Sequence, residues 1–447
     1  MKMLFRKYSP VNKSLLQSVF NAQKNCCINV SKCSSLAIKD SGRTSIDIQG
    51  KSYSFDNFTN VTPKILSHVG KNLHNQKYHP LCMLKQRIIN FFYTDFVGNK
   101  GYPIFSIYDS ISPVVTVEEN FDSLLVPSDH PSRSQTDCYY LNGKHLLRAH
   151  TTAHQSELIR MGLDNFVVFG DVYRRDQIDS THYPVFHQAD GVHLLNKEQM
   201  SNSAGQDLVL FEHNGVHSDA KQAIHTLDAT KVMEQKLKTS LMKLAKSLFG
   251  AETEMRWINE YFPFTHPSWE LEILLHGKWV EILGCGIIRH EILDRVGAGD
   301  RIGWAFGLGL ERIAMQLYSI PDIRTFFSED PGFLNQFRTE DVNQKIVFKP
   351  VSVCPPCIND LSFWLPQGQE SNYSVNDFYD LVRSVGGDMV EQIHLVDEFK
   401  HPKSGKASHC YRIVYRHLER TLTQAEVNEL HKKIEQLCTQ ALGVTIR

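Results

Sequence analysis

Hydrophobic and polar positions recur with different periods along this chain, and each period predicts a different element. After Pro80 the apolar positions keep helical spacing, and a second helical stripe covers residues 225–249 and stops at Gly250. Between residues 257 and 283, three short runs opened by tryptophan are bounded by turn residues. Such runs predict antiparallel strands rather than the alternating strands and helices of a parallel sheet. The pattern therefore predicts an α+β fold with an antiparallel sheet.

A different order of elements begins at about residue 351. Leu361, Phe363 and Leu365 alternate as a strand. The elements that follow are a helix over 376–383, strands over 389–399 and 409–415, a helix opened by a capping box at Thr423 and Glu426, and a short strand at Val444. This βαββαβ order predicts a ferredoxin-like domain.

Length and composition limit what the chain can be. Its 447 residues are enough for two or three domains. With a formal net charge of −1, nucleic acid would have to be contacted through local basic patches. No apolar run approaches membrane-spanning length, so we predict no membrane partner. The ten cysteines show no even framework, which favours a reducing compartment, and Cys354 and Cys357 lack the second ligand pair that zinc would need.

The first forty residues differ from the rest of the chain. They contain seven Lys or Arg residues and no acid before Asp40, together with frequent serines and apolar residues at helical spacing. This composition is typical of a mitochondrial transit peptide, although a disordered basic tail is the alternative. We therefore divide the chain into a transit peptide at 1–40, a first domain at 41–325, a linker at 326–350 and the ferredoxin-like domain at 351–447, and we expect the mature protein in the mitochondrial matrix.

Two distant segments carry the clearest chemistry. In residues 169–190 an aromatic, an arginine and an acid meet at the end of a strand, and a polar loop leads to a second strand that carries Phe186. Residues 307–312, Gly-Leu-Gly-Leu-Glu-Arg, deliver a second arginine. A planar guanidinium fixes the orientation of a phosphate, and the aromatic ring can stack on a base. Together the two segments suit a bent, bound ATP.

This arrangement resembles motifs 2 and 3 of the class II aminoacyl-tRNA synthetases. The residues between them narrow the resemblance to phenylalanyl-tRNA synthetases of the single-chain mitochondrial kind, and it covers residues 75–447. It implies a class II catalytic domain, a C-terminal anticodon-binding domain and a monomer. It also implies that phenylalanine and Mg·ATP give phenylalanyl-adenylate, whose aminoacyl group then passes to the 2′-hydroxyl of tRNA(Phe).

The resemblance assigns roles around ATP. Arg174 and Arg312 are the catalytic cations, because charge on the phosphates calls for positioned cations rather than for an acid and a base. Glu281 is implied as the Mg²⁺ ligand. Asp176 replaces the glutamate that is more usual at its position. The implied ATP-binding residues are Arg174, Asp176, His182, Phe186, Glu281 and Arg312.

The resemblance also assigns the amino-acid pocket. Phe262 and Phe264 are implied to pack on the substrate ring, which two offset ring contacts would recognise well. Thr152 and Asp190 stand where serine and glutamate are more usual, but they keep the hydroxyl and the acid. The implied phenylalanine-binding residues are His150, Thr152, Gln188, Asp190, Phe262, Phe264 and Ala305.

The last hundred residues resemble the anticodon-binding domain of the same family. Lys403, Lys406, Arg412 and Arg416 are the predicted tRNA contacts. We expect Tyr411 and Tyr415, which lie between them, to stack on bases. The alternative is a solvated hairpin without a ligand, since the domain has no excess of positive charge.

Other readings remain open at this point. A synthetase-derived RNA-binding protein without catalysis is the main alternative, and His150 with His154 at i, i+4 is a weak hint of a metallohydrolase. An apolar pocket rejects one added hydroxyl by only about a hundredfold. Because the two predicted domains use the whole chain after residue 40, we expect no editing domain and uncorrected activation of tyrosine.

Overall fold

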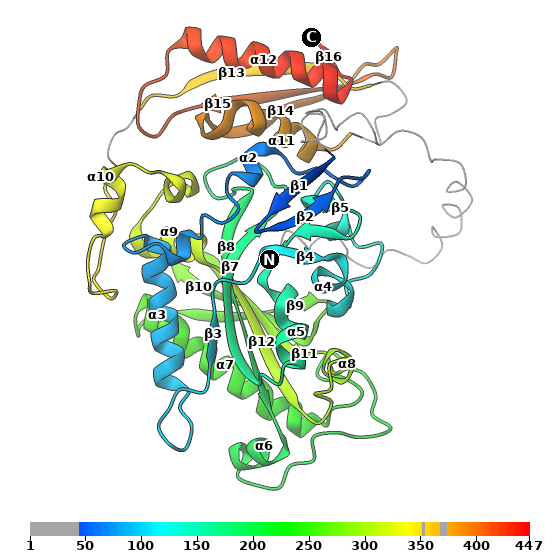
Figure 1. Cartoon of the computed structure of the whole chain (residues 1–447), viewed down its shortest axis with the longest axis vertical. Helices are drawn as coiled ribbons and strands as arrows, with labels where there is room; N and C mark the ends of the chain where they lie inside the picture. Colours follow the sequence, from blue (N-terminus) through cyan, green and yellow to red (C-terminus); the bar gives the residue numbers. More distant parts are fainter. Residues whose placement is uncertain (1–43, 351–353, 367–372) are drawn as a thin grey trace.

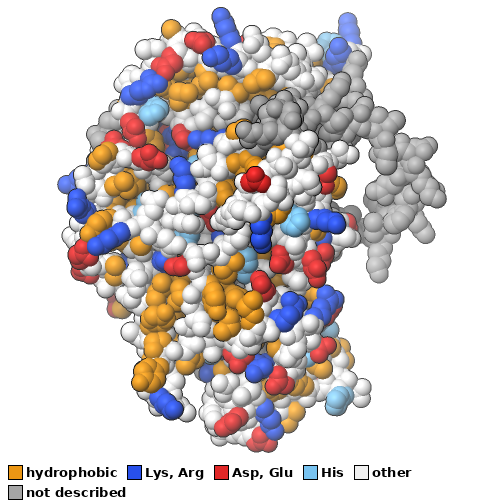
Figure 2. All heavy atoms as spheres, in the orientation of Figure 1, with side chains coloured by type: hydrophobic (Ala, Val, Ile, Leu, Met, Phe, Trp, Pro, Cys, Tyr) orange, Lys and Arg blue, Asp and Glu red, His pale blue; other side chains and the backbone are white. Residues whose placement is uncertain are grey.

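The computed structural model describes residues 44–350, 354–366 and 373–447. The predicted transit peptide at 1–40 lies outside these residues. The described residues form two domains that stack on each other, with the carboxy-terminal domain at the upper end of Figure 1. Charged side chains of both signs are interspersed over the visible face (Figure 2), in agreement with the net charge of −1.

A seven-stranded sheet forms the centre of the first domain. Its order is β3-β7-β8-β12-β11-β10-β9, and the neighbouring strands are antiparallel except for β3 and β7. The predicted antiparallel sheet is therefore confirmed. The strands are β3 (Ser106–Tyr108), β7 (Asn165–Tyr173), β8 (Val185–Leu195), β9 (Met255–Phe262), β10 (Thr265–Leu275), β11 (Lys278–Ile288) and β12 (Ile302–Gly309).

Three helices, which contact one another and the sheet, enclose the larger core. α3 (Pro80–Asp95) and α7 (Leu227–Phe249) are the helices predicted from periodicity, and α9 (Leu310–Tyr318) continues directly from β12. Pro80 lies in the first turn of α3, where its missing N–H leaves no bond unmade. The apolar stripe of α7 is buried in this core, as the periodicity predicted. These helices pack against the sheet, and none of their residues belongs to the second, smaller core described next.

The second core contains smaller elements and the predicted amino-acid pocket. A three-stranded sheet leads into two short helices, with a third helix beside them. These elements are β4 (Val114–Thr116), β5 (Tyr140–Asn142), β6 (His145–Leu147), η6 (Thr151–His154), α5 (Gln155–Arg160) and α8 (His290–Arg295). Phe262, Phe264 and Ala305 belong to this core, so the pocket is built into it.

Several elements of the first domain differ from the prediction or were not predicted. β3 was not predicted, and β3 and β4 join different sheets, since β4 belongs to the small sheet and β3 to the large one. Thr116 ends β4 because it forms a capping box with Glu119. The remaining elements are β1 (Ser45–Ile48), β2 (Lys51–Ser54), α2 (Pro63–Leu66), η3 (Leu73–Asn75), α4 (Val117–Asn120), η4 (Asp122–Leu124), η5 (Pro131–Arg133), α6 (Lys197–Ala204) and η7 (Ile323–Phe327).

The carboxy-terminal domain has the predicted ferredoxin-like order. Its elements are β13 (Cys357–Trp364), α11 (Val375–Gly386), η10 (Gly387–Met389), β14 (Val390–Lys400), β15 (Ala407–Tyr415), α12 (Gln424–Leu442) and β16 (Thr445–Ile446). The strand order is β14-β15-β13-β16, and α11 packs against α12. Residues 326–350, predicted as a linker, carry α10 (Pro331–Leu334) and η8 (Asn335–Phe337), and their Phe333 and Phe337 are buried in the large core.

The two domains contact each other at the loop that joins β7 and β8. Nε of Arg175 donates to Asp380 on α11 at 2.7 Å, and Arg383 donates to the same carboxylate at 2.9 Å. The backbone N–H of Ile393 on β14 donates to the carbonyl of Ile178 in the loop at 3.1 Å. Asp380 and Arg383 are buried, so the charges are paired away from water. The loop is therefore tied to the docked carboxy-terminal domain.

Candidate active site

The β7–β8 hairpin carries the first predicted phosphate-binding group. Arg174 directly follows β7, and its Nε donates to the carbonyl of Ala149 at 2.6 Å. The centre of its guanidinium lies 5.0 Å from the ring centre of Phe186 on β8. Loss of hydration lowers the pKa of Arg174, and the nearby acidic groups, including Asp176 and Asp190, only partly offset this effect. Arg174 can thus grip an anion beside a ring that can stack on a base.

The second predicted cation lies at the start of α9. Nη1 of Arg312 is 3.5 Å from the Glu281 carboxylate on β11, and the Arg312 side chain is 46% exposed. The preceding residue, Glu311, is buried and accepts from the backbone N–H of His187 at 2.8 Å and from its ring at 2.6 Å. This bond ties the first turn of α9 to β8. The bond therefore sets the position of Arg312, the next residue of α9.

A second carboxylate and a third arginine lie beside Glu281. Glu272 on β10 is directly opposite Glu281, so both side chains lie on the same face of the sheet. Arg256 on β9 pairs with Glu272 at 2.6 Å and lies 4.3 Å from the ring centre of Trp279. Arg256 and Glu272 were not predicted from the sequence, because only the register of strand pairing shows which residues are cross-strand neighbours.

The two carboxylates fit a hard cation. Mg²⁺ takes oxygen ligands and is usually held by one or two carboxylates together with substrate phosphates. Glu281 and Glu272 supply such a pair next to the predicted phosphate position. Within residues 44–350, 354–366 and 373–447, no group of three or more His, Cys, Asp or Glu side chains could hold a metal ion.

The loop between β7 and β8 holds the two other predicted ATP contacts. Nδ1 of His182 is 2.7 Å from the Asp179 carboxylate. Burial lowers the pKa of His182, but the hydrogen bond to Asp179 and the charge of Asp176 outweigh it, so the net pKa is raised. The Asp176 carboxylate accepts the backbone N–H of Gln177 at 2.8 Å. The two side chains thus stabilise the loop itself.

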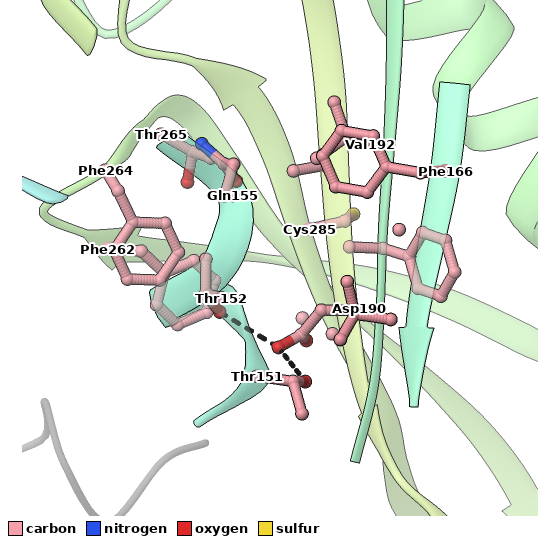
Figure 3. A pocket seen from close by; sticks show the side chains of 16 residues that line it. Thr151, Thr152, Gln155, Phe166, Asp190, Val192, Phe262, Phe264, Thr265 and Cys285 are labelled. Atoms are coloured by element: carbon pink, nitrogen blue, oxygen red, sulfur yellow. Dashed lines mark hydrogen bonds between the residues drawn. The ribbon is translucent and has the colours of Figure 1, made fainter. Parts of the chain in front are cut away.

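The predicted amino-acid pocket is an enclosed, mainly apolar space (Figure 3). Phe262 and Phe264 lie on one side of it, with ring centres 6.0 Å apart and planes inclined by 12°. Val192, Phe166 and Cys285 lie on the opposite side of the view. The nearly parallel rings form one wall, which suits an aromatic side chain packed against it. Ala305 also lines the pocket, as predicted.

A carboxylate is the polar end of this pocket. Asp190 accepts hydrogen bonds from the hydroxyl of Thr152 at 3.0 Å and from that of Thr151 (Figure 3). Burial raises the pKa of Asp190, and the two hydroxyls and Arg174 only partly offset this effect. A buried carboxylate that makes no ion pair with any described residue suits a ligand ammonium group. Thr151 was not predicted, because its role depends on the turn of η6.

The predicted residues His150 and Gln188 also lie at this site. His150 precedes η6, and burial followed by the charge of Arg174 lowers its pKa to about 3, so the ring is neutral. Gln188 is buried on β8, two residues before Asp190. Gln155 lines the pocket, and neither polar atom of its buried side chain has a hydrogen-bond partner among the described residues. Gln155 was not predicted, because the surrounding residues 151–157 are mostly polar and only the fold shows that its side chain is buried.

A buried arginine supports the segment that carries these residues. Arg148 donates to the Asp171 carboxylate and to the Asp171 carbonyl, both at 2.6 Å. It passes beneath Gly170, where an added Cβ would lie 2.1 Å from a guanidinium nitrogen. The glycine in Phe-Gly-Asp is therefore needed for this close approach. Arg148 fixes the start of η6 and with it the pocket hydroxyls.

The predicted tRNA contacts lie on the carboxy-terminal domain and differ in their pairing. Arg412 makes two hydrogen bonds of 2.8 Å to Asp360, and Arg416 lies 3.3 Å from Glu391. Lys403 and Lys406 are exposed in the loop between β14 and β15. The expectation that Tyr411 and Tyr415 stack on bases is wrong. Both rings are buried in the core of this domain, because they share a strand face with Ile413.

Comparison with known families identifies both domains. Residues 65–217 and 222–337 match the tRNA synthetases class II core domain (F), and residues 352–447 match the ferredoxin-fold anticodon binding domain. The chain therefore belongs to the class II aminoacyl-tRNA synthetases, and within them to the mitochondrial phenylalanine–tRNA ligases, as its curated relatives establish.

Three of these relatives span nearly the whole chain. A probable mitochondrial phenylalanine–tRNA ligase of Drosophila melanogaster is 56% identical over 90% of this chain and 92% of the relative. The mitochondrial phenylalanine–tRNA ligase of Mus musculus is 53% identical over 91% and 90%. The Saccharomyces cerevisiae protein of the same name is 38% identical over 90% and 95%.

Family membership establishes the general activity. The chain is a ligase that charges tRNA with phenylalanine, and class II synthetases use ATP and a divalent metal ion. Its substrates are thus tRNA, the amino acid and ATP. None of the described helices is long and apolar enough to cross a bilayer.

Proposed function

We propose that this enzyme acts as a monomer in the mitochondrial matrix, forms phenylalanyl-adenylate from phenylalanine and Mg·ATP, and transfers the phenylalanyl group to mitochondrial tRNA(Phe) without editing. One observation carries the proposal. Asp190, the carboxylate of the pocket with the Phe262–Phe264 wall, lies on the same strand as Phe186, and the charge of Arg174 beside Phe186 lowers the pKa of Asp190 in opposition to burial. An amino acid and a nucleotide can therefore meet in one cleft.

The residues of the pocket orient phenylalanine for attack. The substrate ammonium group pairs with the carboxylate of Asp190, next to the hydroxyls of Thr151 and Thr152. The side chain packs on Phe262 and Phe264 above Ala305. The substrate carboxylate is left to point toward Arg174, which is where an activated phosphate would lie. Holding the two reactants in this way supplies much of the rate by proximity.

Arg174 and Arg312, the cations at the phosphate end of the site, act on ATP. Arg174 grips the α-phosphate while its neighbour Phe186 stacks on adenine. Arg312 covers the other face of adenine or reaches the γ-phosphate, and Asp176 and His182 complete the loop contacts. Glu281, with Glu272 opposite, would hold Mg²⁺, which neutralises phosphate charge when it is bound.

The same pocket bears on the discrimination between phenylalanine and tyrosine. Hydrophobic pockets discriminate against one added hydroxyl by only about a hundredfold. The polar atoms of Gln155, which face no partner among the described residues, also leave room for a hydroxyl to bond. We therefore expect measurable activation of tyrosine. Rapid hydrolysis of pre-formed Tyr-tRNA by the enzyme would contradict this part of the proposal.

Pyrophosphate exchange with each of the twenty amino acids is the decisive experiment, using protein that lacks residues 1–40. We expect exchange with phenylalanine, weaker exchange with tyrosine, and none with the others. Exchange with a different amino acid would overturn the pocket assignment. No exchange at all, with tRNA binding retained, would favour an RNA-binding protein without catalysis. Sedimentation with and without tRNA checks the monomer.

A further inference from the structure

Arg256 belongs to the charged groups at the phosphate end of the site, but it has no role in the proposed function. It lies on β9, the edge strand of the large sheet, opposite Glu272 on β10, which in turn lies opposite Glu281 on β11. At the other side of Glu281, Nη1 of Arg312 lies 3.5 Å from the carboxylate. Two arginines thus flank two carboxylates, and we call these four residues the charged row.

The register of the strands places the charged row on the face of the sheet that carries the amino-acid pocket. Side chains alternate between the two faces of a strand, and Trp257 and Ile282 pack in the large core. Their neighbours Arg256 and Glu281 therefore point away from that core. Ala305, which lines the pocket, belongs to the smaller core and also points away from the large one. Arg256 thus lies on the side of the sheet where the reactants are proposed to bind.

Two contacts hold the guanidinium of Arg256 in a fixed orientation. Nε and Nη2 lie 2.7 Å and 2.6 Å from one carboxylate oxygen of Glu272. The centre of the guanidinium lies 4.3 Å from the ring centre of Trp279, which stands two residues before Glu281 and so on the same face. The pair with Glu272 does not use Nη1, and the Arg256 side chain is 44% exposed, so one side of the fork can reach a ligand.

A guanidinium held in this way suits phosphate. A planar fork binds phosphate oxygens in a defined geometry, which an ammonium on a flexible stem cannot do. Stability alone does not explain the arrangement, because water screens an ion pair whose arginine is nearly half exposed. Arg256 therefore has the chemistry of a third phosphate-binding cation beside Arg174 and Arg312.

The order of the strands indicates which phosphates Arg256 would meet. Phe186, the proposed adenine contact, lies on β8, and Arg174 directly follows β7. From β8 the sheet continues as β12-β11-β10-β9, so Arg256 lies on the strand farthest from the adenine contact. A phosphate chain that starts at Arg174 and passes the carboxylates of β11 and β10 turns its outer phosphates toward Arg256.

We propose that Arg256 is a further catalytic residue, which binds the β- and γ-phosphates of ATP and stabilises them as the leaving pyrophosphate, with Trp279 as its positioning residue. In the activation step a carboxylate oxygen of phenylalanine forms a bond to the α-phosphorus. The bond from that phosphorus to the oxygen that bridges to the β-phosphate breaks, and its electron pair leaves with pyrophosphate. Negative charge thus accumulates on the part of ATP nearest to Arg256. The inference rests on the adenylate chemistry proposed above.

Pyrophosphate itself tests this role, because it is a substrate of the exchange reaction. Arg256→Ala should raise KM for pyrophosphate by about 10- to 100-fold, as for the loss of a charged hydrogen bond, and should leave KM for phenylalanine unchanged. Transfer of the phenylalanyl group from pre-formed adenylate to tRNA involves no pyrophosphate and should keep its wild-type rate. Arg256→Lys should recover only part of the loss, because it keeps the charge without the fork.

Two further variants separate binding of pyrophosphate from a general effect of the substitution. Arg295→Ala is the matched control, because it also removes a half-exposed arginine that pairs with a glutamate, on α8. It should leave the KM values for pyrophosphate and phenylalanine unchanged. Trp279→Leu keeps Arg256 but removes the ring that orients it, and it should raise KM for pyrophosphate by a smaller factor than Arg256→Ala does.

Chemical rescue keeps the test readable if Arg256→Ala is also less stable. Ethylguanidinium added to Arg256→Ala should restore part of the exchange, and it should not stimulate wild type or Arg295→Ala. A wild-type KM for pyrophosphate in Arg256→Ala, or a transfer step slowed as much as exchange, overturns the proposal, since Arg256 would then be structural. Absence of exchange in wild type would instead refute the proposed adenylate chemistry.

Discussion

At the proposed amino-acid end of the site, Asp190 and two threonine hydroxyls are buried and bonded to one another, whereas at the proposed phosphate end Arg312 is half exposed and loosely paired. Asp190 already accepts two hydroxyls and is buried. Arg312 is 46% exposed and reaches Glu281 only at 3.5 Å. The two ends are proposed to bind the two reactants of one reaction, yet they are built in opposite ways.

The difference follows from what each end must recognise. Selecting a phenyl group and an ammonium requires a desolvated pocket whose shape and bonds exist before the substrate arrives. A triphosphate carries its own strong charges, so exposed arginines can exchange water for phosphate at little cost. We therefore expect substitutions at the amino-acid end to affect both folding and catalysis, and those at the phosphate end to affect mainly catalysis.

The largest expected effect concerns Arg174, which borders both ends. Arg174→Ala should lower kcat for adenylate formation by at least about 10²–10³-fold, the loss seen when one positioned charge-stabilising group is removed. Arg174→Lys should recover only a small part, because an ammonium cannot keep the bond to Ala149 and grip phosphate as a fork. Pyrophosphate exchange measures both. Full recovery with lysine would show that charge alone, and not orientation, matters here.

The next effect separates activity from stability at Asp190. Asp190→Asn removes the charge that pairs with the substrate ammonium, so KM for phenylalanine should rise by about 10- to 100-fold, as for a charged hydrogen bond worth roughly 1.5–3 kcal/mol. The folded protein should nonetheless become more stable at neutral pH. Burial raises the pKa of Asp190, which means that its ionised form opposes folding.

The sign of the pH dependence tests this argument. Between the ordinary pKa of an aspartate and the raised folded value, the folded state holds a proton that the unfolded state has released. The contribution of Asp190 to stability thus falls as the pH rises through this window. The advantage of Asp190→Asn in Tm should therefore shrink as the pH is lowered toward about 4. An advantage that grows on acidification would contradict the raised pKa.

A smaller effect is expected at the hydroxyls that support Asp190. Thr152→Val keeps the shape of the side chain but takes one donor from a buried carboxylate, which should reduce the free energy of unfolding by about 1–3 kcal/mol. Thermal unfolding at neutral pH measures this loss. Thr136→Val, which removes a partly buried hydroxyl bonded to Ser134 at 2.8 Å outside the pocket, is the control and should cost less.

The sequence predicted the two domains and proposed most of the residues of the candidate site, and the reason lies in local pattern. Arg174, Phe186 and Arg312 stand in short motifs whose meaning survives without a structure, and the period of α3 and α7 predicted both helices. Thr151, Gln155 and Glu272 were missed because only a turn or a strand register brings them to the site.

The tyrosines illustrate an error that the sequence could have prevented. Tyr411, Ile413 and Tyr415 are spaced two residues apart on one strand, so they share its buried face. Trp364 directly follows Phe363, so it lies on the face of its strand opposite to that of Leu361 and Phe363. Alternation alone therefore distinguishes core rings from surface rings. The prediction failed because aromatic residues were weighed by type and by neighbouring charge rather than by face.

The smallest expected effect lies at the phosphate end and completes the comparison. A double-mutant cycle with Arg312→Ala and Glu281→Gln should give a coupling free energy of unfolding of about 0–1 kcal/mol, because water screens the charge of Arg312, which is 46% exposed, even though Glu281 is only 9% exposed. The same two substitutions should each reduce pyrophosphate exchange strongly. This pair thus serves catalysis rather than folding, in contrast to Asp190 and Thr152. A coupling as large as that between Asp190 and Thr152 would mean that the phosphate end is as preorganised as the amino-acid end, and the proposed difference would not hold.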